Sequence, residues 1–137
     1  MAETRTTTAE SGVRIFYEVE GTGPPVVLLH GITENRRAWD DFMPALRDSF
    51  QVIRLDLRGH GESDKGESYG PLELASDVRA VVDALDVGAP HVVGHSLGGM
   101  VATVETWDGL GHWLHLVEPE RFVARVRSFT ATADTSG

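Results

Sequence analysis

The chain has 137 residues, and its 12 Lys and Arg against 21 Asp and Glu give a formal net charge of −9. That length suits one domain over residues 1–137. The acidic balance argues against a nucleic-acid-binding surface, and the absence of cysteine excludes disulfides and cysteine nucleophiles. Residues 1–10 lack the apolar core of a secretion signal, and no apolar run is long enough to cross a membrane, so a cytoplasmic location is expected.

The first elements predicted are a β-hairpin and a buried strand. Residues 13–20 (VRIFYEVE) are rich in β-branched and aromatic side chains, and the threonine-rich residues 4–9 precede them, which together favour a hairpin. Residues 21–25 (GTGPP) are a dense turn signal. The run PVVLLH at 25–30 does not alternate, which is typical of a central strand of a parallel sheet.

A helix and a second strand are predicted next. Between residues 34 and 50 an apolar stripe at helical spacing indicates a helix, interrupted by Pro44, which predicts an irregular start or a kink. The stripe consists of Trp39, Phe42, Met43, Leu46 and Phe50. Residues 51–57 (QVIRLDL) return to strand character.

The chain then alternates once more between helix and strand. Residues 58–70 form a long glycine-rich polar loop, of a length that is often functional. Residues 71–87 carry an apolar helical face, and residues 90–94 (PHVVG) form a short strand. This order of strands and helices predicts an α/β fold with three layers, in which helices cover both faces of a mostly parallel sheet.

The most informative motif is G-x-S-x-G at residues 94–98, directly after a predicted strand. A sharp turn from strand to helix places the serine, Ser96, at its tip, and it needs glycines where side chains would collide with backbone. The hydroxyl would then lie at a helix N-terminus, where the Leu97 N–H can face a developing oxyanion. Ser96 is therefore the predicted nucleophile.

A second motif, His30-Gly31-Ile32, ends the predicted central strand. An oxyanion hole needs a second backbone N–H, delivered from the loop after such a strand. Ile32 is the predicted donor.

In this order and spacing, LLHGITENRRAW, DLRGHGESD and VVGHSLGGM resemble the α/β-hydrolase superfamily, particularly its small esterase, haloperoxidase-like and lactonase-like members. The resemblance covers residues 13–103 and resumes at 109–122 (GLGHWLHLVEPERF), which is similar to the family's catalytic-histidine segment. It implies that His112 is the general base and that a terminal helix spans 118–129. The chain is thus expected to be a reduced core, 1–103, followed by a histidine-loop and helix segment, 104–130.

The resemblance leaves the third member of the triad open, because the family's acid-bearing strand and its substrate-covering cap have no counterpart between residues 103 and 109. The acid holds the imidazole in the correct tautomer and stabilises the imidazolium. Candidates are Asp108, Glu105 and Glu118, of which Asp108 is preferred, and a Ser–His dyad without an acid remains open.

The other histidines are assigned structural roles. Four of them, His30, His60, His91 and His95, lie in strands, at strand ends or in family loop motifs. His112, His115 and Glu118 also form H-x-x-H-x-x-E, which on a helix would place three metal ligands on successive turns. Such a pattern is common by chance, so no metal site and no cofactor are predicted.

These features predict a carboxylic ester hydrolase that needs no cofactor and acts on small-molecule esters. Without a cap the pocket should accept a range of short and medium acyl groups. Trp39 and Met100 are candidates for lining it, although core packing is the commoner role of such side chains. Lactone hydrolysis, perhydrolysis and a non-catalytic scaffold descended from a hydrolase remain alternatives.

The missing strands also bear on assembly. An uncovered sheet edge and apolar faces favour association, so a homodimer is predicted, in which C-terminal elements can be exchanged. In that arrangement His112 of one chain would serve Ser96 of another. A monomer whose last helix covers the gap is the alternative.

Overall fold

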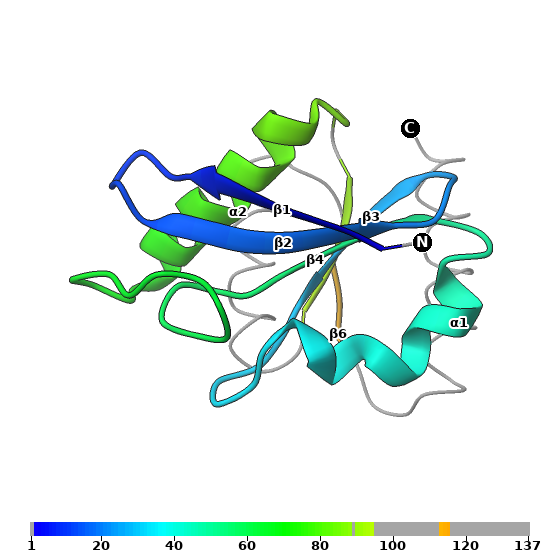
Figure 1. The fold of residues 1–137 in the computed structure, drawn as a ribbon, viewed down its shortest axis with the longest axis horizontal. Helices are drawn as coiled ribbons and strands as arrows, with labels where there is room; N and C mark the ends of the chain where they lie inside the picture. Colours follow the sequence, from blue (N-terminus) through cyan, green and yellow to red (C-terminus); the bar gives the residue numbers. More distant parts are fainter. Residues whose placement is uncertain (1, 89, 95–112, 116–137) are drawn as a thin grey trace.

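The computed structural model describes residues 2–88, 90–94 and 113–115, and its centre is a six-stranded sheet with the order β1-β2-β4-β3-β5-β6 (Figure 1). Strands β4, β3, β5 and β6 are mutually parallel, and an antiparallel hairpin extends the sheet beyond β4. The predicted α/β class with a mostly parallel sheet is confirmed.

The hairpin consists of β1 (Glu3–Thr8) and β2 (Arg14–Glu20), paired antiparallel as predicted. The turn between them is closed by a hydrogen bond from the Ala9 N–H to the Val13 carbonyl, with Gly12 at φ +93°. Strand β2 also pairs antiparallel with β4, which fixes the hairpin to the rest of the sheet.

The central strands are β3 (Pro25–Leu29), β4 (Gln51–Leu55) and β5 (His91–Gly94). Strand β3 lies between the other two, and its last four residues are fully buried, in keeping with the unbroken aliphatic run. The glycine turn before β3 is required sterically, because a Cβ at Gly21 would stand 2.3 Å from the Phe50 carbonyl oxygen.

The helix predicted over residues 34–50 is shorter than expected and mostly not α-helical, whereas the irregular start predicted from Pro44 is present. A 3₁₀ helix, η1 (Arg36–Phe42), is followed by a four-residue α-helix, α1 (Met43–Leu46). Pro44 explains the break: it has no N–H to donate to the Asp40 carbonyl, and the Met43 N–H bonds that carbonyl instead, in the tighter 3₁₀ pattern. The predicted apolar stripe nevertheless faces inward.

The second predicted helix is α2 (Pro71–Leu85), which begins after Gly70 and ends at Asp86 in the left-handed conformation. Most of its predicted apolar face is buried, but Leu72, in the first turn, is 71% exposed.

Two apolar clusters, one on each face of the sheet, make the predicted three layers. On one face α2 packs against alternate residues of the central strands, such as Val27, Leu29 and Ile53. On the other face η1 and α1 pack against the intervening residues, such as Val26 and Leu28. Figure 1 shows α2 and α1 on opposite sides of the sheet.

A short strand, β6 (Trp113–His115), pairs parallel with β5 and was not predicted. Its strand conformation contradicts the helical placement of His115 that the H-x-x-H-x-x-E pattern would need. The rest of the predicted segment 104–130, including the helix at 118–129, lies outside the described residues. Within the part of the chain that is described, no helix is long and apolar enough to span a membrane.

Candidate active site

The two predicted oxyanion-hole segments leave the sheet from neighbouring strands. Strands β3 and β5 are parallel, and Leu29 pairs with Gly94, so both end at the same level of the carboxyl edge. The loop that carries Ile32 follows β3, and the G-x-S-x-G serine follows β5 by two residues. Carboxyl ends of parallel strands are where ligands bind in open α/β sheets, and this edge is the candidate site.

His30 fixes the start of the loop after β3. Its Nε2 accepts a hydrogen bond from the Leu57 N–H at 3.0 Å, so Nδ1 carries the proton and donates to the Gly31 carbonyl at 2.7 Å. The ring is fully buried, and burial, with His60 nearby, holds the pKa of His30 below its ordinary value. His30 is therefore a neutral structural residue, as the sequence predicted.

The next four residues form a closed turn. The Glu34 N–H donates to the Gly31 carbonyl at 3.2 Å, and the Gly31 N–H donates to Glu34 Oε1 at 2.9 Å. Thr33 has φ +66°, an uncommon conformation for a β-branched residue. At the turn's outer corner Ile32 is 63% exposed, and its N–H has no hydrogen-bond partner among the described residues. Among the described residues the loop thus leaves the Ile32 N–H unpaired, and its role in an oxyanion hole stays a prediction.

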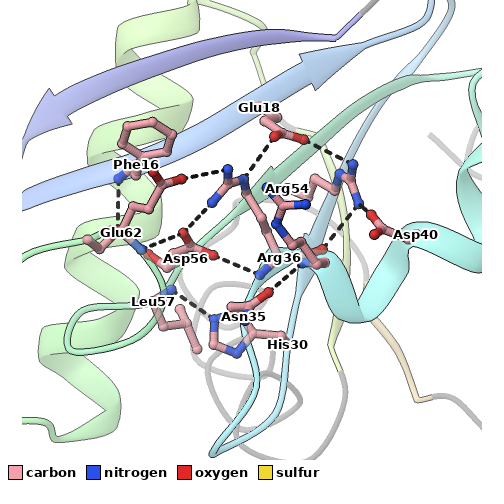
Figure 2. A network of polar contacts seen from close by, with 12 residues as sticks. Phe16, Glu18, His30, Asn35, Arg36, Asp40, Arg54, Asp56, Leu57 and Glu62 are labelled. Atoms are coloured by element: carbon pink, nitrogen blue, oxygen red, sulfur yellow. Dashed lines mark hydrogen bonds and ion pairs between the residues drawn. The ribbon is translucent and has the colours of Figure 1, made fainter.

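Asp56 ties this loop to the loop after β4, as Figure 2 shows. Its carboxylate accepts from the Arg36 N–H at 2.7 Å, from Arg36 Nη1 at 2.6 Å and from the Glu62 N–H at 2.9 Å. Both Asp56 and Arg36 are buried. Gly61 allows the approach, because a Cβ there would stand 2.3 Å from the Asp56 carboxylate.

The network extends across the sheet through two more ion pairs of Glu18 (Figure 2). One Glu18 oxygen lies 3.0 Å from Arg36 Nε and the other 3.0 Å from Arg54 Nη2, while Arg54 also contacts Asp40. Burial opposes the charged form of Arg36, but the bonds to Glu62 and Glu18 outweigh it and raise the pKa of Arg36. A network of paired charges therefore joins the loops after β3 and β4 to strands β2 and β4.

Sequence reasoning missed this network, although a signal for it was present. Arg54 and Asp56 stand in or next to the apolar run QVIRLDL, and Glu18 stands in VRIFYEVE. A charged residue inside a buried strand needs a partner of opposite charge, so these positions could have been matched with one another.

The remaining predicted site residues fall in two groups. Ser96, Leu97, Met100, Asp108 and His112 lie outside the described residues. Trp39 is described: its side chain is 2% exposed and packs with Met43 and Leu46 in the cluster under η1 and α1. Trp39 therefore packs in the apolar core. A contact between Trp39 and a substrate stays a prediction.

Strand β6 adds one observation about the histidine segment. Trp113 pairs with Val92 and His115 pairs with Gly94, so β6 reaches the carboxyl edge of the sheet at His115. His112 immediately precedes the strand in sequence.

The described residues also contain a cavity that lies away from Ile32. A cavity of about 540 Å³ is lined by the hairpin turn and by residues 64–68, with Arg58 at its wall, and contains none of the predicted site residues. No group of three potential metal ligands occurs among the residues that the structure describes.

Comparison with known proteins shows which family the chain resembles. The model of the alpha/beta hydrolase fold matches residues 24–104, more than half of the chain. A soluble epoxide hydrolase from Corynebacterium sp. (strain C12) is 39% identical over 99 residues, 72% of this chain and 35% of that protein. The acetyltransferase component of an acetoin cleaving system from Pseudomonas putida is 44% identical over 98 residues, 69% of this chain and 26% of that protein.

Solved structures agree. Est816, described as an N-acyl homoserine lactone degrading enzyme, matches with a TM-score of 0.73 and 38% identity over 80% of this chain and 42% of its own. Epoxide hydrolase VrEH1 from Vigna radiata matches with a TM-score of 0.76 and 29% identity over 86% of this chain and 40% of its own. The chain thus spans 26% to 42% of the length of these four proteins. The chain belongs to the α/β-hydrolase family.

Proposed function

We propose that this chain is a serine-dependent hydrolase of carboxylic esters. The observation that carries the proposal is the Ile32 N–H, which has no hydrogen-bond partner among the described residues. Ile32 lies in the loop after β3, which ends level with β5, and Ser96 follows the last residue of β5 by two positions in sequence. A donor and a nucleophile at one sheet edge are two of the groups that acyl transfer needs, and the third is a general base.

The proposed reaction has two halves. Ser96 Oγ attacks the ester carbonyl while His112 accepts its proton, and the oxyanion is stabilised by the N–H groups of Ile32 and Leu97. The tetrahedral intermediate then expels the alcohol, which takes the proton from His112, and leaves an acyl-serine. Water, activated by the same histidine, releases the acid. Asp108 is the proposed orienting acid, and no cofactor takes part.

Ser96, the residue at the tip of the predicted strand-to-helix turn, favours esters over the epoxides named for several relatives. If a serine alkoxide opened an epoxide, the product would be an ether, which water attacking a carbonyl cannot release. An acyl-serine is an ester, which the same oxyanion hole can hydrolyse. Ser96 therefore supports turnover on acyl substrates and not on epoxides.

Lactones are the second candidate substrate class. The observation that favours them is the 38% identity to Est816, which is described as degrading N-acyl homoserine lactones. A lactone is a cyclic ester, so the same two half-reactions apply and only the leaving alcohol stays attached to the acyl group.

The test compares the full chain with Ser96→Ala. We expect p-nitrophenyl butyrate hydrolysis that falls by at least about a thousandfold in Ser96→Ala, since removal of a nucleophile leaves only binding and the oxyanion hole. A fluorophosphonate should label the wild type at Ser96. A Ser96→Ala variant with full activity, or a wild type that neither labels nor hydrolyses, would favour the non-catalytic scaffold.

A further inference from the structure

The loop between β3 and η1 is held by a reciprocal pair of hydrogen bonds around Ile32 and Thr33. Glu34 takes part through both its backbone N–H, which donates to the Gly31 carbonyl, and its carboxylate, which accepts from the Gly31 N–H. The pairing resembles a capping box, in which one side chain returns to the backbone that precedes it. The two residues between the bonds have little freedom.

The two hydrogen bonds between Gly31 and Glu34 decide which backbone N–H groups of the loop remain unpaired among the described residues. The Gly31 N–H is taken by the Glu34 carboxylate, whereas within the described residues neither Ile32 nor Thr33 has a partner for its N–H. Both residues are exposed, so their donors stand at the surface of the carboxyl edge. Without the carboxylate, the Gly31 N–H would be a third unpaired donor and the turn would lose one of its two closing bonds.

The conformation of Thr33 shows that the turn is held against a local preference. A threonine at φ +66° is strained, because its branched Cβ crowds the backbone in the left-handed region. Such conformations persist only where surrounding contacts over-determine them. The two bonds of Glu34, with His30 and Arg36 anchored at either end of the loop, supply those contacts.

We infer that Glu34 is a positioning residue, whose carboxylate holds Gly31 so that the Ile32 N–H stays directed at the oxyanion. The inference rests on the proposed function. Glu34 does not touch the substrate in this scheme; it acts through the turn. The bond needs an oxygen acceptor and not a negative charge, so a glutamine amide oxygen can replace the carboxylate.

The test measures kcat and KM of Glu34→Ala, Glu34→Gln and the wild type on p-nitrophenyl butyrate, each per active site counted by fluorophosphonate titration. Loss of a complete oxyanion donor costs about 100- to 1000-fold in kcat. A displaced donor should cost less, so we expect about a 10- to 100-fold fall in kcat for Glu34→Ala with KM within about twofold. Glu34→Gln should return kcat to within about threefold of the wild type.

A control variant separates positioning from general loss of stability. Asp41→Ala removes an exposed carboxylate from η1, seven positions further along, and should leave kcat and the melting temperature unchanged. Counting active sites removes any contribution from unfolded protein. The affinity of a boronic acid that mimics the tetrahedral intermediate should fall in Glu34→Ala by the same factor as kcat/KM.

Three results would overturn the inference. These are a wild-type kcat in Glu34→Ala, a defect in Glu34→Gln as large as that in Glu34→Ala, and a loss confined to KM. If Ser96→Ala is inactive while Glu34→Ala is normal, only the positioning role fails. If Ser96→Ala keeps full activity, the proposed function fails and the inference fails with it.

Discussion

His30 couples the protonation of one ring to the shape of the loop after β3. Its Nε2 must be unprotonated to accept the Leu57 N–H, and Nδ1 donates to the Gly31 carbonyl. Burial lowers the pKa of His30 in the folded chain, whereas the unfolded chain has the ordinary value of about 6.5. Below that pH the unfolded chain binds a proton that the folded chain does not.

The contribution of neutral His30 to the free energy of unfolding should therefore be fully present above about pH 6.5. It should fall as the pH drops below that value towards the lowered pKa of His30. The loss can reach about 1.4 kcal/mol per pH unit for this one group. Urea unfolding at several pH values between 5 and 8 measures it. His30→Gln keeps an acceptor for the Leu57 N–H and removes the titration, so its pH profile should be flatter than that of the wild type. Parallel profiles would show that His30 is not responsible.

At the scale of elements, the sequence pattern predicted the helices and strands whose formation depends on neighbouring residues. Strand β3 and helix α2 follow from an aliphatic run and a 3.6-residue period. The helix at 34–50 is shorter than predicted and begins as a 3₁₀ helix, because the missing N–H of Pro44 interrupts the α-helical bonds despite a correct apolar stripe. The antiparallel pairing of β2 with β4 could not be derived, because it joins residues more than thirty positions apart.

In the candidate site, too, the features set by local sequence were predicted and the contacts that depend on the fold were not. A short motif at a strand end was enough to single out the Ile32 N–H, which has no partner among the described residues, while its role as an oxyanion donor stays a prediction. The hydrogen bond from the Gly31 N–H to the Glu34 carboxylate depends on a turn geometry that residue spacing does not reveal. The network of Glu18, Arg36 and Asp56 depends on strand register. These contacts are non-local or conformational, so composition and periodicity contain little information about them.

A buried ion pair joins α2 to the loop at 58–70. The Arg58 guanidinium donates to both oxygens of Asp77, at 2.6 and 2.8 Å, and also to the Ser68 carbonyl and Ser11 Oγ. The bonds to Asp77 raise the pKa of Arg58, and both side chains are buried. Removing one partner leaves the other charge buried and unpaired.

Asp77→Ala should therefore lower the free energy of unfolding by about 3–5 kcal/mol, measured by urea denaturation. Asp83→Ala, an exposed position on the same helix, is the matched control and should change it by less than about 0.5 kcal/mol. If Asp77→Ala does not fold, the double variant Arg58→Met/Asp77→Leu tests the same idea, since replacing both charges by apolar groups should restore a cooperative transition. Equal effects of Asp77→Ala and Asp83→Ala would contradict the prediction.

At the scale of the whole molecule, the predicted homodimer allows the proposed base, His112, to come from a second copy of the chain. Strand β6 pairs Trp113 with Val92 and reaches the carboxyl edge at His115, and Ser96 follows the last residue of β5 by two positions in sequence. His112 comes before Trp113 in the chain. We therefore propose a shared site, in which the imidazole at position 112 comes from the second chain of the predicted homodimer.

Mixing two inactive variants tests that arrangement. Ser96→Ala and His112→Ala chains, exchanged to equilibrium at equal concentration, give about one half heterodimers, each with one complete site of two if the site is shared. The expected activity is then about one quarter of the wild-type value, and light scattering should give twice the chain mass. A Ser96→Ala/His112→Ala double variant mixed with wild type serves as the control for exchange. A monomeric mass, or no recovery in an exchanged mixture, would place serine and histidine in one chain, because a site built within a single chain has no complete copy in any heterodimer.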